Sequence, residues 1–471
     1  MTGEARAIRS VCVAGAGIVG LSAALAFARA LPGVRVSILE MPADPAALTD
    51  RLPGSLPTIH LFHAAIGLDE LELVRAGAAT HLLGTRFENW SADGAPWYHV
   101  FDRYGMPAGD ADFHPVWQRA RLAERALRFH RYAAAATLAE AGKFVHPSGD
   151  PASPLGSFLY ALRLEPDRYR ERLEAAASAL PRERGAITDI ERRADGGIGA
   201  LLLEDGLRIE ADLFIDCAGP AAPLLSAVDP GFEQWDEWLP CDRVVLDRDA
   251  GEDPNPCDLA VASDDGWRWR SGRAYCSAFA TGDGGGEIIR PGRRPEPWVR
   301  NVLALGDAAV AIDPLHSTSL HLAQSAILRA LELLPGRDCH PLELREYNRR
   351  TEQETCRVRD FLALHYLRSG RRDTPFWAAM AERSAPAGLS RTLEQFERRG
   401  RLPFFEEESF DRQSWLAVLL GLGVMPREAE PVAAGVDLEQ AAPAMDRLAA
   451  RLAALPERFP PYREVLAKMR A

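Results

Sequence analysis

Residues 11–40 of the chain read VCVAGAGIVGLSAALAFARALPGVRVSILE. A short apolar run, an Ala/Leu-rich segment and a second apolar run that ends on Glu40 predict a strand, a helix and a second strand. Three glycines fall in the turn before the helix, at Gly15, Gly17 and Gly20. The first glycine serves the bend, the second lets the backbone approach a pyrophosphate, and the third lets the helix pack on the strand. Glu40 is placed to bind ribose hydroxyls and the helix start to bind phosphate, so the stretch predicts a dinucleotide site.

Two other interpretations compete for this stretch. Residues 11–28 carry no charge, which is typical of a transmembrane helix, and the arginines before them with Ala-Phe-Ala at their end are typical of a secretory signal. Neither needs three glycines at this spacing followed by a second strand that ends on an acid. The dinucleotide interpretation is therefore favoured, although the motif does not say which dinucleotide binds.

Length and composition narrow the class of protein. With 471 residues the chain is long enough for two or three domains and for burial of a large cofactor. The net charge is −12 and no basic run stands out, which argues against nucleic acid as a partner. The seven cysteines form no C-x-x-C pair, so they predict buried thiols of a cytoplasmic protein. We therefore expect neither a disulfide frame nor a metal site. Because the transmembrane interpretation of residues 11–28 is disfavoured, we also expect no membrane partner.

Later segments extend the same sheet and add a second one. The run at 211–219, ADLFIDCAG, predicts a buried strand that returns to the sheet of Gly15. Antiparallel strands that form a floor beside the cofactor are predicted around Val244 and at 258–262, 267–269 and 274–280. A further strand is predicted at 84–90, and residues 97–101 form an aromatic cluster. Helices are predicted at 58–76, 119–141 and 166–180, and the chain from 341 to 471 is expected to be mostly helical.

A second motif lies far from the first along the chain. An apolar run at 302–305 precedes Gly306-Asp307, and residues 313–323 open a helix. An acid after a strand can bind a sugar-alcohol hydroxyl, and the backbone N–H groups at a helix start can face a ring carbonyl or an anion. The segment 41–56, rich in Pro, Ala and Asp, predicts a loop over the bound cofactor.

Several motifs follow one another in a specific order, namely Leu213-Phe214-Ile215-Asp216-Cys217, Gly266-Trp267-Arg268-Trp269, Asp313-Pro314-Leu315-His316-Ser317-Thr318 and Ser414-Trp415. In order and spacing they resemble the flavin-dependent tryptophan halogenase family over nearly the whole chain. The resemblance implies an α/β fold with a Rossmann-like FAD-binding box of the flavin monooxygenase and halogenase type. The box is expected over 1–340 with a substrate-facing insertion at about 57–150, followed by a helical substrate-covering cap at 341–471.

The resemblance also implies a cofactor and a chemistry. In that family reduced FAD supplies the oxidising power, and hypohalous acid reaches a lysine beside the aromatic substrate. FAD contacts are implied for Gly15, Gly17, Gly20, Glu40, Gly306 and Asp307. Thr318 and Ser319 are implied to lie near the halide position. An aromatic small molecule is the implied substrate, and a separate flavin reductase and a homodimer are both compatible with the resemblance.

The departures from the family pattern concern the reacting groups. The family lysine stands eight residues before the Trp of a Lys/Arg-Phe-x-Asn-Trp element, which is present here at 86–90, and this position holds Leu82. The acid that pairs with the lysine is replaced by His316, and the glycine after the Thr is Ser319. A leucine can neither carry a halogen on nitrogen nor hydrogen-bond hypohalous acid.

We therefore expect an FAD-dependent oxidoreductase, monooxygenase-like or oxidase-like, that acts on an aromatic or indolic small molecule in secondary metabolism without lysine-dependent halogenation. His316 is the first candidate for a catalytic group, as a general base or by orienting a substrate hydroxyl, against the alternative of a histidine bonded to backbone. His81, beside Leu82, is the second, against the alternative of a core histidine. Two other functions stay open: a halogenase that guides hypohalous acid with another group, and an inactive FAD-binding scaffold.

Overall fold

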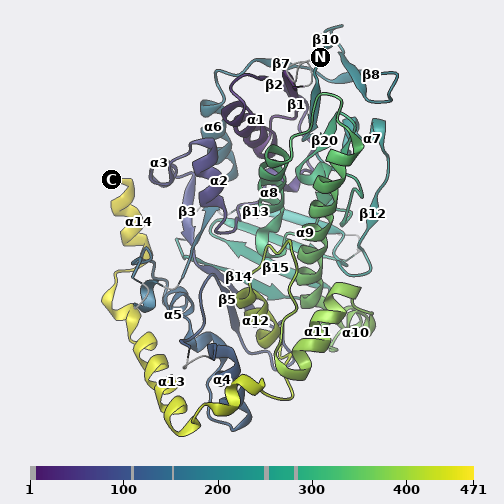
Figure 1. Cartoon of the computed structure of the whole chain (residues 1–471). Helices are drawn as coiled ribbons and strands as arrows, with labels where there is room; N and C mark the ends of the chain where they lie inside the picture. The colour runs from purple at the N-terminus through teal and green to yellow at the C-terminus, as the bar shows by residue number, and fades with distance from the viewer. Residues whose placement is uncertain (1–6, 108–110, 151–152, 157, 249–253, 281–284) are drawn as a thin grey trace.

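The computed structural model describes residues 7–107, 111–150, 153–156, 158–248, 254–280 and 285–471. Figure 1 shows the N-terminal sheet and helix α1 at the top, a second large sheet across the middle, and the C-terminal helices along the right side, the lower end and the left side. The last helix, α14 (Tyr462–Arg470), contacts α3 (Glu70–Arg75). Within these described residues, no helix is both long enough and apolar enough to cross a membrane.

The first sheet is built on the predicted strand, turn, helix and strand, which the structure confirms. β1 (Ser10–Ala14) and β2 (Arg35–Glu40) pair in parallel and are joined by α1 (Ile18–Ala30). β11 (Leu213–Asp216) pairs in parallel with the other side of β1, so the predicted return to this sheet is confirmed. The order is completed by β20 (Val302–Ala304) beside β11 and by the edge strands β19 (Trp298–Val299) and β7 (Arg182–Arg184).

Helix α1 is buried along most of its length. Residues 18–27 are all buried. The helix contacts α8 (Thr318–Glu332), α6 (Pro166–Ala176) and α2 (Ile59–Ile66). This position in the core explains why the segment carries no charge, because a parallel sheet is covered by helices that water does not reach.

The second sheet has seven strands in the order β17, β13, β16, β15, β14, β4 and β5. The predicted strands of the floor are confirmed as β13 (Arg243–Arg248), β14 (Cys257–Ala262), β15 (Gly266–Ser271) and β16 (Ala274–Phe279), with β17 (Glu287–Ile288) at one edge. β4 (Gly84–Glu88) pairs in parallel with β14, and β5 (Trp97–Val100) forms the other edge. The parallel pair therefore joins an early segment of the chain to this later sheet.

The described residues also form one two-stranded sheet and two three-stranded sheets of short strands. They are β3 (Ala79–Leu82) paired with β6 (Ala161–Leu164), then β8 (Ile187–Arg192), β9 (Ile198–Leu203) and β10 (Arg208–Ile209), and then β12 (Glu233–Gln234), β18 (Gly292–Arg293) and β21 (Val310–Ala311). Helix α7 (Pro223–Val228) follows β11.

The single helix predicted at 119–141 is wrong. The chain forms α4 (Phe113–Leu122), a 3-10 turn at Phe129–Tyr132 and α5 (Ala134–Glu140) instead. Glu124, after α4, adopts a left-handed φ of 59°, and both Phe129 and Tyr132 are buried. Burial of these two rings in the core overrides the helix propensity of the Ala/Leu/Arg sequence.

The helix predicted at 58–76 is two helices. α2 ends at Ile66 because Gly67 adopts a left-handed φ of 77°, which is a common way for a helix to end. α3 begins after Asp69, whose carboxylate accepts a hydrogen bond from the N–H of Glu72 at 2.9 Å. This break places Glu70 at the start of a new helix.

The chain from 341 onward is mostly helical, as predicted. Its helices are α9 (Pro341–Leu367), α10 (Pro375–Glu382), α11 (Ala387–Arg399), α12 (Arg412–Gly421), α13 (Leu438–Ala453) and α14. The division into a box over 1–340 and a cap over 341–471 stays a prediction.

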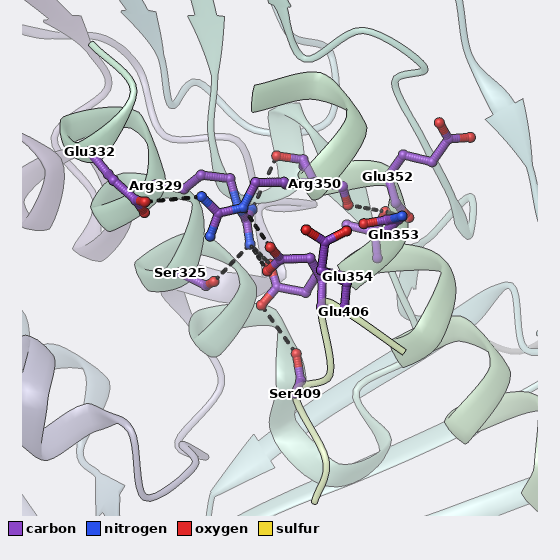
Figure 2. A network of polar contacts seen from close by, with 12 residues as sticks. Ser325, Arg329, Glu332, Arg350, Glu352, Gln353, Glu354, Glu406 and Ser409 are labelled. Atoms are coloured by element: carbon purple, nitrogen blue, oxygen red, sulfur yellow. Dashed lines mark hydrogen bonds and ion pairs between the residues drawn. The ribbon is translucent and has the colours of Figure 1, made fainter. Parts of the chain in front are cut away.

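A buried ion pair joins α8 to α9. Figure 2 shows Arg329 of α8 directed at Glu354 of α9, and Nη2 of Arg329 lies 2.7 Å from Oε2 of Glu354. The other carboxylate oxygen accepts a hydrogen bond from Ser409 at 3.1 Å. Arg350 of α9 forms a more exposed pair with Glu332 of α8 at 3.1 Å. These two ion pairs hold α8 against α9, and α8 is the helix that begins at Thr318.

Candidate functional site

The turn after β1 needs glycine at two positions. Gly15 has a φ of 113°, and a Cβ there would lie 2.5 Å from the carbonyl oxygen of Cys217. A Cβ at Gly20 would lie 2.0 Å from the carbonyl oxygen of Gly15, so α1 packs directly on the turn. These contacts match the bending and packing roles expected of the first and third glycines of a dinucleotide turn.

The start of α1 already receives an anion, the carboxylate of Asp50. Val19 donates its N–H to Oδ1 of Asp50 at 2.9 Å, and a Cβ at Gly17 would lie 1.8 Å from Oδ2. Burial raises the pKa of Asp50 to about 6, against the hydrogen bonds from the Val19 and Ile18 N–H groups. The helix start thus binds negative charge. A pyrophosphate fits the same N–H groups once Asp50 has moved away.

Asp50→Ala is therefore expected to bind FAD about fivefold more tightly, since displacing a carboxylate from a helix start costs about 1 kcal/mol. The raised pKa means that protonation favours the inward position of Asp50, so FAD affinity of the unmodified protein should fall as the pH drops below about 6. Titration of FAD by fluorescence quenching measures both effects. Asp44→Ala, in the same segment, is the control, and equal FAD affinity in Asp50→Ala and the unmodified protein contradicts the prediction.

The second motif lies beside the first. Gly306 has a φ of 61°, and a Cβ there would lie 3.0 Å from Cγ2 of Val19 in α1. Asp307 follows β20 and accepts the N–H of Thr49 on Oδ2 at 2.9 Å. Burial raises the pKa of Asp307 to about 7, although the hydrogen bonds with Thr49 oppose this. The segment 48–50 therefore bridges the two motifs.

Glu40 lies at the end of β2, as predicted. Its Oε1 accepts a hydrogen bond from Nη2 of Arg184 at 2.7 Å, and its side chain is 28% exposed. The carboxyl ends of β1, β2 and β20 lie at one edge of the parallel sheet, which is where open α/β sheets bind ligands. Glu40 and Asp307 thus flank the glycine turn.

His316 lies in a row of three histidines. Its Nδ1 is 3.2 Å from Nδ1 of His99 on β5, and its Nε2 is 2.8 Å from Nε2 of His365 on α9. The rings of Phe87, Phe361 and Phe410 surround His316, with centroid distances of 5.1, 5.1 and 5.9 Å. Burial lowers the pKa of His99 and of His365 to about 3. Burial and the two neighbouring imidazoles lower the pKa of His316 well below its ordinary value.

One carbonyl group fixes the direction of the hydrogen bonds in this row. Nδ1 of His365 faces the carbonyl oxygen of Phe361 at 3.0 Å, so this nitrogen donates. In neutral imidazoles Nε2 of His365 then accepts from Nε2 of His316, and Nδ1 of His316 accepts from Nδ1 of His99. Nε2 of His99 is left as an acceptor, and it is buried without a hydrogen-bond partner in the described chain. The row thus ends on a free lone pair.

A strained turn holds His316. His316 and Ser317 both adopt left-handed φ values, 62° and 54°, which are uncommon outside glycine and cluster at functional sites. Buried Asp313 accepts the N–H of Leu315 at 2.9 Å and anchors the start of the turn. A Cβ at Gly54 would lie 1.8 Å from Oγ of Ser317, so the glycine makes room for this turn.

Thr318 and Ser319 begin α8 and are both buried. The hydroxyl of Thr318 has no hydrogen-bond partner within the residues that the structure describes. A buried, unpaired hydroxyl beside the free N–H groups of a helix start fits a bound halide or a polar edge of a cofactor.

The other two residues singled out in the sequence lie on β3. Leu82 is 3% exposed. His81 points to the other face of the strand and contacts Glu70 and Tyr462, at 3.1 and 2.7 Å. His316 and His81 are thus members of two different clusters.

A cavity of about 710 Å³ lies near the row of histidines but is not lined by it. It is lined by Trp97 and Tyr98 of β5, among other residues. Trp97 stacks on Phe87 with a centroid distance of 4.2 Å, and Phe87 contacts His316, so two rings separate His316 from the cavity. His316 itself keeps part of its surface exposed.

The parallel sheet, the glycine turn, the anion at the helix start and the Gly-Asp turn beside it define a dinucleotide-binding α/β protein. The sequence model of the family described as tryptophan halogenase matches residues 10–284 and 286–438, and the chain belongs to this family. Its known members depend on flavin, and this chain has the mixed α/β fold of the solved flavin-dependent halogenases.

Individual relatives span almost the whole chain. The structure of BrvH, a flavin-dependent halogenase from Brevundimonas sp. BAL3, is 32% identical with a TM-score of 0.91 and covers 98% of this chain and 99% of that one. Xcc4156, a flavin-dependent halogenase from Xanthomonas campestris, is 30% identical with a TM-score of 0.88 over the same shares. The tryptophan 7-halogenase KtzQ of Kutzneria sp. (strain 744) is 26% identical over 90% of this chain and 91% of that protein.

Three residues of the site were not found from the sequence. Asp50 lay in a segment identified only as a loop, and His99 was one member of an aromatic cluster. His365 lies within the long helix α9 and carries no local motif. Only the fold brings these residues to the glycine turn and to His316.

Proposed function

We propose that this chain is an FAD-dependent oxidoreductase that oxidises or oxygenates an aromatic small molecule without a lysine intermediate. The row of neutral histidines, with His316 at the family's acid position, is the observation that carries the proposal. Bound FAD supplies the oxidising power. The cavity of about 710 Å³ lined by the rings of Trp97, Tyr98 and Trp117 supports a flat aromatic substrate, with indoles as the first class to test.

The two departures from the family pattern together leave the net charge of the site unchanged, because one removes a positive charge and the other a negative charge. Leu82 removes the positive charge of the family's lysine, and His316 removes the negative charge of its acid. Removing one partner of a buried charge pair costs about 3–5 kcal/mol because the other charge is left unpaired. Loss of both charges avoids this cost, which supports a site that works without either of them.

His99 carries the proton-accepting role in this proposal. Burial lowers the pKa of His99 to about 3, so its imidazole is neutral at neutral pH and Nε2 keeps its lone pair. Nε2 of His99 accepts a hydrogen bond or a proton from the substrate once the packing around it opens, because His99 is buried and does not line the cavity. His316 and His365 hold the imidazole in the tautomer that keeps Nε2 free. His316 thus orients the base.

The cofactor contacts follow from the two turns. Gly15, Gly17 and Gly20 with the start of α1 are proposed to hold the pyrophosphate, and Glu40 the ribose hydroxyls. Asp307 is proposed to bind a hydroxyl of the sugar-alcohol chain. We assign Thr318 and Ser319, at the start of α8, to an anion or a ring carbonyl.

Halogenation is the second candidate function. Two solved relatives at 32% and 30% identity are described as flavin-dependent halogenases. An unprotonated imidazole, unlike a leucine, can hydrogen-bond hypohalous acid. In this version the row of histidines guides hypohalous acid in place of the lysine.

The test is incubation of the FAD-loaded protein with a flavin reductase, oxygen, bromide and a panel of indoles, followed by mass spectrometry. The expected product has gained an oxygen atom or lost two hydrogen atoms and contains no bromine. Brominated product would overturn the first proposal in favour of the second. Failure to load the protein with FAD would overturn both proposals and would indicate an inactive scaffold.

Restoring the family pair is the matching variant experiment. Leu82→Lys with His316→Glu is expected to produce bromination, because both charged partners are then present. Leu82→Lys alone is expected to produce less, since its cation has no buried partner. Leu82→Met, which keeps the site apolar, is the control. Bromination by Leu82→Met at the level of the double variant would contradict this role for the charges.

We further propose that the protein acts in the cytoplasm, in secondary metabolism, and receives reduced flavin from a separate reductase. Its seven cysteines are free thiols, which suits a reducing compartment. The curated relatives are tryptophan halogenases by name, and this origin supports an aromatic substrate.

A further inference from the structure

A second cluster of titratable groups lies away from the flavin turns and from His316. It contains Glu70 at the start of α3, His81 on β3 and His146 in the segment after α5. Oε1 of Glu70 lies 3.1 Å from Nε2 of His81 and 3.7 Å from Nε2 of His146. The sequence predicts no metal site from its cysteines, and Glu70, His81 and His146 are too widely spaced to form a local motif.

We propose that Glu70, His81 and His146 bind a first-row divalent transition metal, with Zn²⁺ as the best-suited ion. The three ligand atoms lie within 4.8 Å of one another. In a tetrahedral site with bonds of about 2.1 Å, two ligand atoms are about 3.4 Å apart, which is between the two distances measured from Glu70. Two imidazoles and a carboxylate are a ligand set that zinc uses in proteins.

The neighbours of His81 hold it in a ligand's orientation. Nδ1 of His81 and the hydroxyl of Tyr462 are 2.7 Å apart, and this hydroxyl also accepts the backbone N–H of His81. Phe144 stacks on the imidazole with a centroid distance of 4.2 Å. These contacts leave Nε2 directed at Glu70. Metal-binding histidines use their second nitrogen in this way.

Hydrogen bonds from neighbouring side chains also hold the carboxylate of Glu70 in place. Tyr160 donates its hydroxyl to Glu70 at 3.0 Å from Oε2. His60 links the same Oε2 to the carbonyl oxygen of Tyr160, with distances of 3.2 and 3.0 Å. The hydroxyl of Tyr160 also lies 3.2 Å from Oε1, the oxygen that faces the two imidazoles. Outer hydrogen bonds of this kind orient a carboxylate ligand.

The site has one open side. The side chain of His146 is 49% exposed and that of Glu70 is 25% exposed, whereas His81 is fully buried. A metal ion can therefore enter from solvent and keep a water molecule as a fourth ligand. It would tie α3, β3 and the segment after α5 together, with α14 attached through Tyr462. The proposal does not depend on the function proposed above.

The experiment uses full-length protein without a histidine tag, stripped with a chelator and titrated with Zn²⁺ against a chromophoric competitor. We expect one ion per chain, a higher melting temperature with Zn²⁺, and visible absorption of a tetrahedral Co²⁺ complex. His146→Ala and Glu70→Gln are expected to weaken binding at least about a hundredfold, and Tyr462→Phe about tenfold.

The control is His340→Asn, which removes an exposed histidine elsewhere and keeps a side-chain acceptor for the start of α9. It should bind Zn²⁺ like the unmodified protein. His146 is exposed, so its replacement should leave the circular dichroism spectrum unchanged. Less than half an ion bound per chain, or equal Zn²⁺ affinity in His146→Ala and His340→Asn, would overturn the proposal. Binding of only Mg²⁺ or Ca²⁺ would also overturn it.

Discussion

Replacement of His99 by glutamine is expected to lower the rate of product formation by about a hundredfold or more, which is the usual size of a general-base contribution. The reason is the free lone pair on Nε2 of His99, the end of a row whose direction is fixed by the carbonyl group of Phe361. Glutamine retains hydrogen bonding but cannot accept a proton. The measurement is the steady-state rate with reduced flavin supplied, together with the FAD affinity.

The control is His114→Gln. His114 is also a buried histidine with a pKa lowered by burial to about 3, but it packs beside Trp117 and Phe396 and does not belong to the row. Its replacement should leave the rate unchanged once folding has been verified. His316→Ala and His365→Ala should each lower the rate less than His99→Gln does. His316 and His365 orient His99, whereas His99 carries the unpaired nitrogen that accepts the proton. Full activity in His99→Gln would show that His99 is not the general base.

The pH profile gives a second test of the same row. An ordinary histidine becomes protonated as the pH falls through 6.5, but burial lowers the pKa of His99 and His365 to about 3. The row therefore stays neutral between about pH 8 and about pH 5, so its protonation should cause no loss of rate in that range. A loss with a midpoint near 6.5 that disappears in His99→Gln would contradict the neutral row.

The parts of the site that are local in the chain could be predicted. Gly15, Gly17 and Gly20 lie between a strand and a helix, so their spacing alone specifies the turn. Gly306-Asp307 could be matched to them because it also follows a buried strand and because the family resemblance supplied the order. The failure at 119–141 has the opposite cause, since the burial of Phe129 and Tyr132 depends on distant parts of the chain.

Residues that meet only through the tertiary structure could not be predicted. His99 comes from the edge strand β5 and His365 from the last turn of α9, and neither has a motif. His81 was predicted as a catalytic candidate because it adjoins Leu82, but successive residues of a strand point to opposite faces. The structure accordingly places His81 with Glu70, and Leu82 faces away from that cluster.

Replacement of Glu354 by alanine is expected to lower the free energy of unfolding by about 3 kcal/mol, because it leaves the buried guanidinium of Arg329 with only its longer pair to Glu407, at 3.4 Å. Arg329 and Glu354 are 4% and 5% exposed, so water cannot replace the carboxylate. Denaturant unfolding measures the loss. Glu406→Ala is the matched control: Glu406 pairs with Arg349 at 2.8 Å on the surface, and such pairs contribute at most about 1 kcal/mol.

The pH dependence of this ion pair has a definite sign. Burial alone would raise the pKa of Glu354, but the contact with the His321 imidazole and the charge of Arg329 outweigh it and lower the pKa from 4.5 to about 2. Between these values the unfolded chain binds a proton that the folded chain does not, so the contribution of Glu354 is present above pH 4.5 and is lost as the pH falls toward 2. Glu354→Gln should therefore be less stable than the unmodified protein at neutral pH, and the difference should shrink on acidification. A difference that grows as the pH falls would show that the pair does not stabilise the joint between α8 and α9.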